Sequence, residues 1–193
     1  MMKLTRTVTP TDYPIDLEEV KQHSRVYHSD DDVFLQGLIA AATDYLDGPS
    51  GILGKAMITQ EWLLELPSWC SDIPLPIEPV QAVTVSYIDA NGEIQAVADA
   101  DFDLEHNPSQ RTVLRWQRGI DRPTLQSDHR YPVRLTITAG FGAAHDVPAG
   151  VKVAMHMMIS HWFLNREAVS SGAPMSDVPM GASALLARWR AHL

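Results

Sequence analysis

The first residues whose spacing could support chemistry are Gly140-Phe141-Gly142, which follow a predicted strand and precede a predicted helix. A dinucleotide-binding motif has this setting, because its glycines let the backbone approach a pyrophosphate at a helix N-terminus. The third glycine position of that motif holds His145, and Pro148 delays the helix. We therefore interpret the segment as a strand-to-helix connection and predict no cofactor.

A second candidate is Asp99-Ala100-Asp101-Phe102-Asp103, whose alternating carboxylates resemble the start of a calcium-binding loop. Such a loop needs a glycine at its sixth position and a glutamate at its twelfth. Leu104 and Gln110 occupy those positions here. The pattern therefore favours a solvated turn that enters a strand, and we predict no calcium site.

The eight histidines raise the question of a transition-metal site. His156 and His161 share a predicted helix, but a spacing of five residues rotates them by roughly 140° around its axis. Two ligands on one helix need to converge on one face, as a spacing of four residues allows. The sequence also contains no Gly-x-Ser-x-Gly nucleophile motif, and no pair of acids has a context that suggests acid–base catalysis. We predict neither a metal site nor an enzyme.

Composition narrows the class of protein. The chain has 193 residues, of which 45% are hydrophobic and 20% charged, as in ordinary globular proteins. The net charge of −9 disfavours a general nucleic-acid binder, which needs basic side chains to neutralise phosphates. The single cysteine, Cys70, allows no disulfide within the chain. No apolar run is long enough to span a bilayer, and no signal peptide begins the chain, so we expect folding in a cytoplasm.

The elements that would carry these residues begin with two helices. Asp16 and Glu19 have the spacing of a capping box, and Ile15 and Val20 that of a hydrophobic staple. A second helix begins at Ser29–Asp32. Apolar residues recur at helical spacing and form its core face, which consists of Leu35, Leu38, Ile39, Ala42 and Leu46.

The middle of the chain has the alternating pattern of strands. The first predicted strand carries Ile58, Gln60, Trp62, Leu64 and Leu66 on one face. Further strands are predicted at Val83–Ile88, Glu93–Val97, Phe102–Glu105, Thr112–Trp116 and Val133–Thr138. The turn Asp89–Gly92 joins two of them into a hairpin.

A long apolar helix follows Pro148, and a short one closes the chain after a segment rich in Ser, Gly, Ala and Pro. Val153, Met157 and Ser160 lie away from the predicted core face of the long helix, so we predict that they form a subunit interface. The short helix brings Trp189 together with two arginines and two leucines. Either Trp189 folds back into the core of the protein, or this helix binds a partner.

These elements predict an α+β fold: a helical core of two N-terminal helices, one long and one short C-terminal helix, with a central antiparallel β insertion. The expected parts are residues 1–56 (N-terminal helical part), 57–140 (β insertion), 141–169 (long core helix) and 170–193 (flexible arm and C-terminal helix).

Several segments, taken in order, are similar to one known family. They are Pro14–Lys21, His28–Asp32 with Leu38–Ala42, Ile58–Trp62, Ile73–Pro76 with Pro79–Val83, Tyr87–Gly92, Ala139–Gly142 leading to Val147-Pro148, His161–Val169, and Pro179–Gly181 with Leu185-Leu186. The set resembles the head–tail connector (adaptor) family of tailed bacteriophages, including relatives in prophages and gene transfer agents.

The resemblance implies a structural role. Such proteins form a ring, usually dodecameric, on the portal protein at the exit of the DNA-filled head, and they offer a platform for stopper and tail-completion proteins. The C-terminal segment would then reach the portal through Leu185, Leu186, Arg188, Trp189 and Arg190. An acidic chain would also suit a channel in which DNA makes only transient, non-specific contact. Assembly in the bacterial cytoplasm and a final position in the particle follow from the same resemblance.

Three other interpretations stay open. The chain could be another ring component, such as a stopper or tail-completion protein that does not contact the portal. It could be a small hydrolase or a sugar- or small-molecule-binding module built on the β region, which would require a pocket with convergent polar groups. It could also be a cytoplasmic oligomer of another kind.

Overall fold

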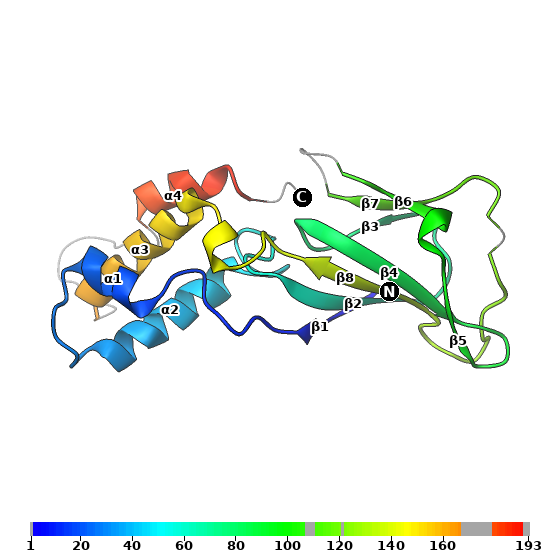
Figure 1. The fold of residues 1–193 in the computed structure, drawn as a ribbon, viewed down its shortest axis with the longest axis horizontal. Helices are drawn as coiled ribbons and strands as arrows, with labels where there is room; N and C mark the ends of the chain where they lie inside the picture. Colours follow the sequence, from blue (N-terminus) through cyan, green and yellow to red (C-terminus); the bar gives the residue numbers. More distant parts are fainter. Residues whose placement is uncertain (1, 107–110, 121, 167–178, 191–193) are drawn as a thin grey trace. The chain divides into compact units, whose positions relative to one another are not determined.

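The computed structural model describes residues 2–106, 111–120, 122–166 and 179–190. The chain is a mixed α and β protein that divides into two compact units (Figure 1). The β unit combines the first ten residues with Thr59–Gly140, and the helical unit combines Thr11–Ile58 with Phe141–Arg190. Over the described residues no helix is long and apolar enough to cross a membrane.

The helical unit contains four α-helices among its described residues. They are α1 (Leu17–Ser24), α2 (Asp32–Leu46), α3 (Ala149–Leu164) and α4 (Met180–Ala187). Helix α3 packs against each of the other three. The unit's core is apolar and consists mainly of Ile15, Val20, Leu35, Ile39, Leu46, Val151, Met155, Met158, Ile159 and Leu186.

Local signals fix where α1 begins and ends. The Asp16 carboxylate accepts the Glu19 N–H at 2.7 Å, and the Glu19 carboxylate accepts the Asp16 N–H at 3.0 Å. The predicted capping box is therefore confirmed. Ile15 and Val20 are both buried, as the staple requires. Arg25 adopts a left-handed conformation (φ 56°) and ends the helix.

Helix α2 is held at both ends by carboxylates. At its start, Lys21 donates to Asp32 at 2.7 Å, and this hydrogen bond raises the pKa of Lys21. At its end, the buried Asp47 side chain accepts the Met57 N–H at 2.7 Å. Gly48 follows with φ 81°, a conformation that favours glycine, so the chain turns away after Leu46.

Over its described residues, the β unit contains two antiparallel sheets. The five-stranded sheet has the order β1-β2-β8-β4-β5, and the three-stranded sheet the order β3-β7-β6. Their strands are β1 (Lys3–Val8), β2 (Gln60–Leu66), β3 (Asp72–Pro74), β4 (Val80–Ile88), β5 (Ile94–Ala96), β6 (Phe102–Glu105), β7 (Val113–Trp116) and β8 (Val133–Ala139). The strands predicted between residues 58 and 138 are confirmed.

Strand β1 corrects one assignment from the sequence. Residues 1–56 were expected to belong to the helical part, but Lys3–Val8 pairs with β2 as the edge strand of the larger sheet. The Lys3 ammonium contacts the Glu65 carboxylate at 2.6 Å, and the Arg6 guanidinium lies 4.7 Å above the Trp62 ring. These contacts, to a strand almost sixty residues away, stabilise a segment whose own sequence gives little indication of a strand.

The predicted hairpin between β4 and β5 is held by the Asp89 side chain. Its carboxylate accepts the Asn91 and Glu93 N–H groups at 2.9 and 3.0 Å and the Gln95 amide at 3.0 Å. These hydrogen bonds, that of Glu93 first, hold the pKa of Asp89 below its ordinary value. Gly92 completes the turn with φ 85°.

Candidate assembly surfaces

The glycine motif forms a turn. Gly140 and Gly142 have φ values of 140° and 133°, and the Asp146 carboxylate accepts the Ala143 N–H at 2.9 Å. A Cβ on Gly142 would meet that same carboxylate, so the turn itself requires a glycine there. The residues that a nucleotide would need are therefore engaged in connecting β8 to α3, as the sequence analysis interpreted them.

Of the aspartates in the calcium-like motif, Asp99 and Asp101 lie in a short 3-10 helix, Asp99–Asp101, and Asp103 lies in β6, which follows it. Gln110 lies outside the described residues. Within the described ranges, no group of three or more histidine, cysteine or carboxylate side chains is placed to hold a metal ion.

The two histidines of α3 have separate environments. The ring of His156 stacks on that of His23 in α1, with centroids 5.2 Å apart. Burial, and then the proximity of His23, lower the pKa of His156. His161 instead lies near the side chain of Asn165, 3.4 Å away, at the end of the helix. Neither arrangement directs two imidazole nitrogens toward one point.

One small cavity in the β unit bears on the small-molecule alternative. It has a volume of about 100 Å³ and lies beside Trp69, Tyr87 and Trp116. Ligand pockets typically measure about 300–1,000 Å³. The two indole N–H groups are already engaged, since Trp69 donates to the Pro123 carbonyl and Trp116 to the Cys70 carbonyl. Asp101 and Arg122 also line the cavity, but its volume is below the range of typical ligand pockets.

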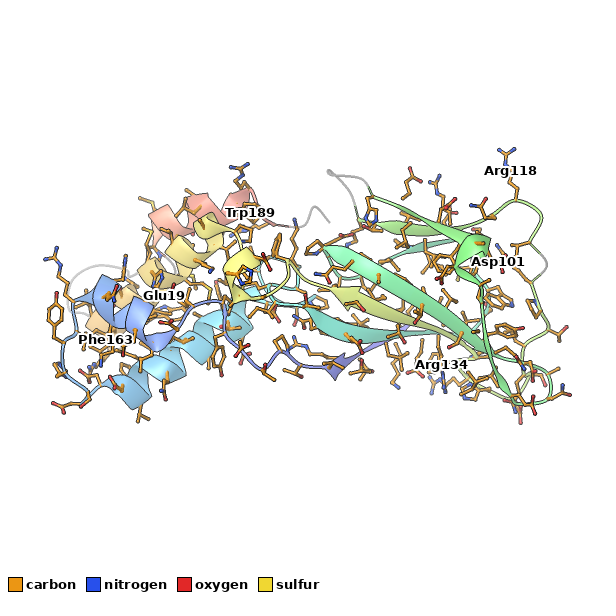
Figure 2. All side chains as sticks on the ribbon, in the orientation of Figure 1. Glu19, Asp101, Arg118, Arg134, Phe163 and Trp189 are labelled. Atoms are coloured by element: carbon orange, nitrogen blue, oxygen red, sulfur yellow. The ribbon has the colours of Figure 1, made fainter. Side chains whose placement is uncertain are left out.

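The C-terminal helix packs into its own unit. Leu186 is fully buried, and the Trp189 ring makes an edge-on contact with Phe141 at 5.8 Å (Figure 2). Of the side chains predicted to bind the portal, Leu186 and Trp189 thus lie in or against the core of the helical unit. Leu185, Arg188 and Arg190 are exposed.

The predicted subunit-interface residues of α3 also differ in their surroundings: two contact other helices of the same unit and one is exposed. Ser160 shares a hydrogen bond of 2.8 Å with Ser24 of α1. Met157 packs under α4, where a Cβ on Gly181 would lie 2.6 Å from its Cε atom. Val153 is the member of the set that is largely exposed, at 45%.

Sequence reasoning missed a further apolar surface, the outer face of α2. Val33, Phe34 and Tyr45 are 84%, 39% and 38% exposed, and Gly37 and Ala41 between them are exposed as well. These five positions fall within roughly 120° of the helix circumference, opposite the buried face. The signal was present in the run Gly37–Ala42, which contains no polar side chain. A helix that is apolar on both faces is normally covered on both.

Comparison with known proteins gives a family match over part of the chain. Residues 14–95 match the family model described as phage gp6-like head-tail connector protein. The matched stretch runs from the start of the capping box into β5. The family resemblance predicted from the sequence is confirmed. No curated protein matches the chain.

Solved structures match nearly the whole chain. The neck of an empty GTA particle computed with C6 symmetry contains a chain of 24% identity and TM-score 0.77, with 99% of this chain and 96% of that chain covered. The virion of a native gene transfer agent (GTA) particle gives 23% identity and TM-score 0.70, covering 98% and 96%. The neck of a native GTA particle computed with C12 symmetry gives 23% and 0.67, covering 100% and 96%. At these identities the matches establish a shared fold.

Proposed function

We propose that this chain is a structural head–tail connector (adaptor) of a tailed phage or phage-like particle. The observation that carries the proposal is the fold match, which spans 99% of this chain and nearly all of a chain from a GTA neck. The connector-family match over residues 14–95 supports it independently. The role is non-enzymatic: the motifs that resembled catalytic or ligand sites serve as turns and packing elements in the described residues.

In this role the chain forms a ring, and we take twelve as its number of subunits. The related necks were computed with C6 and C12 symmetry, which supports a ring of that order. The helical unit, with its exposed apolar surfaces, forms the ring. The chain assembles in the bacterial host cytoplasm and ends at the head–tail interface of the particle.

The ring sits on the portal and carries the stopper or tail-completion protein. Arg188 and Arg190 support portal docking, because both are exposed and lie at the end of a helix that has no acidic residue. Leu185 is available at the same helix. The net charge of −9 supports a lumen past which DNA moves with only transient contact.

Portal docking can be tested by co-purification with the portal protein encoded in the same genome. The double variant Arg188→Glu, Arg190→Glu should lose the portal and keep the unfolding temperature of the native chain. Lys55→Glu, a charge reversal at a site outside α4, is the matched control and should retain the portal. Retention of the portal by both variants would place the docking site away from the two arginines, and failure of the native chain to co-purify with the portal would support the stopper or tail-completion alternative.

A further inference from the structure

The outer face of α2 exposes apolar side chains to solvent, which is energetically unfavourable. Val33 and Phe34 begin the face, Gly37 and Ala41 form a smooth middle, and Tyr45 ends it. Phe34 and Tyr45 also lean on α3, through Phe163 at 6.2 Å and Trp162 at 6.4 Å. A Cβ on Gly37 would meet nothing within 4 Å, so another helix could approach closely there.

A second apolar surface lies on the seam between α3 and α4. Met157 contacts Gly181, and the Trp189 indole lies 3.3 Å from the position that a Cβ on Gly150 would take, so the two helices run antiparallel. Between these two contacts lie Val153 on α3 and Leu185 on α4, which are 45% and 36% exposed. Val153 and Leu185 therefore form a short apolar strip along the line where α3 and α4 contact each other.

The helices that carry the two surfaces differ in charge. Helix α2 contains no lysine or arginine, and its exposed face carries Asp44, with Asp30 (side chain 90% exposed) in the turn before it. Helices α3 and α4 contain no acid; Lys152 lies next to Val153, and Arg188 follows α4. Arg166, which lies over Phe34, is paired with Asp31 at 2.7 Å and adds little net charge to the α2 side.

The two surfaces also lie on opposite sides of one helix. Figure 1 shows α3 between α2 and α4 within the helical unit. A closed ring needs a head-to-tail interface, in which one patch of a subunit contacts a different patch of the next. Two unlike, complementary patches on opposite sides of the helical unit meet that requirement.

We infer that the outer face of α2 docks on the α3–α4 seam of a second copy of this chain. The inference rests on the proposed ring function and specifies the surfaces that build the ring. Exposed Ala41 faces the strip formed by Val153 and Leu185, and Asp44 approaches Lys152. Arg188 stands at the end of the seam, where it reaches both the neighbouring copy and the portal.

The test is cross-linking in the assembled ring. In a Cys70→Ser background, the chain carrying Ala41→Cys and Val153→Cys is mixed with the portal from the same genome and treated with a short bis-maleimide. The expected result is a denaturing-gel ladder that rises toward twelve copies. Each single-cysteine chain should give monomers, and Gln22→Cys with Val153→Cys, which places the first thiol on exposed α1, is the matched control without a ladder.

Electron microscopy of the same samples distinguishes failure of the assigned surfaces from failure of the connector function. Rings on the portal without a ladder would overturn the assignment of surfaces and leave the connector function intact. Dimers from Ala41→Cys alone would also overturn it, because two α2 faces would then meet around a two-fold axis. Portals without rings, for a chain lacking the new cysteines, would overturn the connector function and the inference together.

Discussion

Gly181 of α4 lies directly against Met157 of α3, so close that a Cβ on the glycine would stand 2.6 Å from the methionine Cε atom. This contact joins the last described helix to the long one over a gap of more than twenty residues in the chain. It makes α4 part of the helical core. The portal docking that we propose for this helix therefore depends on its exposed side chains.

The leucine pair of α4 tests this division directly. Leu186 is fully buried and Leu185 is 36% exposed. Leu186→Ala should lower the free energy of unfolding by about 2–5 kcal/mol, because it leaves a cavity in the core. Leu185→Ala should change it by about 0.5 kcal/mol or less. Urea denaturation of both variants measures the difference in unfolding free energy. Equal and small decreases would show that α4 is a flexible arm and not part of the helical core.

The capping box stabilises the start of α1, so its removal is expected to lower the free energy of unfolding. Asp16→Ala removes the acceptor of the Glu19 N–H and should cost about 1 kcal/mol of unfolding free energy. Asp30→Ala is the matched control, since that side chain is 90% exposed and makes only a distant contact with His28. Chemical denaturation should show a loss for the first variant alone.

The buried Asp47 carboxylate predicts a distinction between two substitutions. Asp47→Ala leaves the Met57 N–H without its acceptor and should destabilise the chain by about 1–3 kcal/mol. Asp47→Asn keeps an oxygen that can accept this hydrogen bond and should cost less. Thermal unfolding of both variants gives the comparison; an equal cost would show that the charge of Asp47, not its acceptor oxygen, matters.

The stacked histidines predict a pH dependence of stability. Burial, and then His23, lower the pKa of His156 beneath its ordinary value of 6.5, while Glu19 and Asp16 oppose the shift and Lys152 adds to it. The unfolded chain therefore binds a proton more readily than the folded chain just below pH 6.5. Stability from this site is present in full above that pH and is lost as the pH falls.

Replacing the ring isolates that dependence. His156→Gln should flatten the decline in unfolding temperature between about pH 6.5 and pH 5, relative to the native chain. His161→Gln should keep the native slope, because His161 lies near Asn165 and outside the stack. An unchanged slope in His156→Gln would assign the acid sensitivity to other groups.

Elements with local signals were predictable from the sequence. The capping box of α1 and the turn at Asp89 depend on residues within a few positions of one another, and the β6 bounds Phe102–Glu105 follow the alternating pattern of the sequence; all three are confirmed. Strand β1 was missed because its stabilising partners, such as Glu65, lie far along the chain. The three-residue strand β3 pairs with β7, some forty residues further along the chain, and was not predicted as a strand.

The candidate surfaces were harder to predict for a related reason. The sequence left Trp189 open between a core position and a partner site, and the structure packs its ring against Phe141 and Gly150, while portal binding stays a prediction. Helical spacing placed Met157 and Ser160 away from the core face of α3. It could not show that α4 and α1 cover these two residues. The outer face of α2 was overlooked because exposure depends on which faces the other helices leave open.

Negative-stain electron microscopy of this chain mixed with the portal from the same genome tests the connector function most directly. A connector is expected to give an added ring of density on the portal, with twelve-fold symmetry. A bare portal, with this chain left as free monomers or as rings of its own, would contradict it.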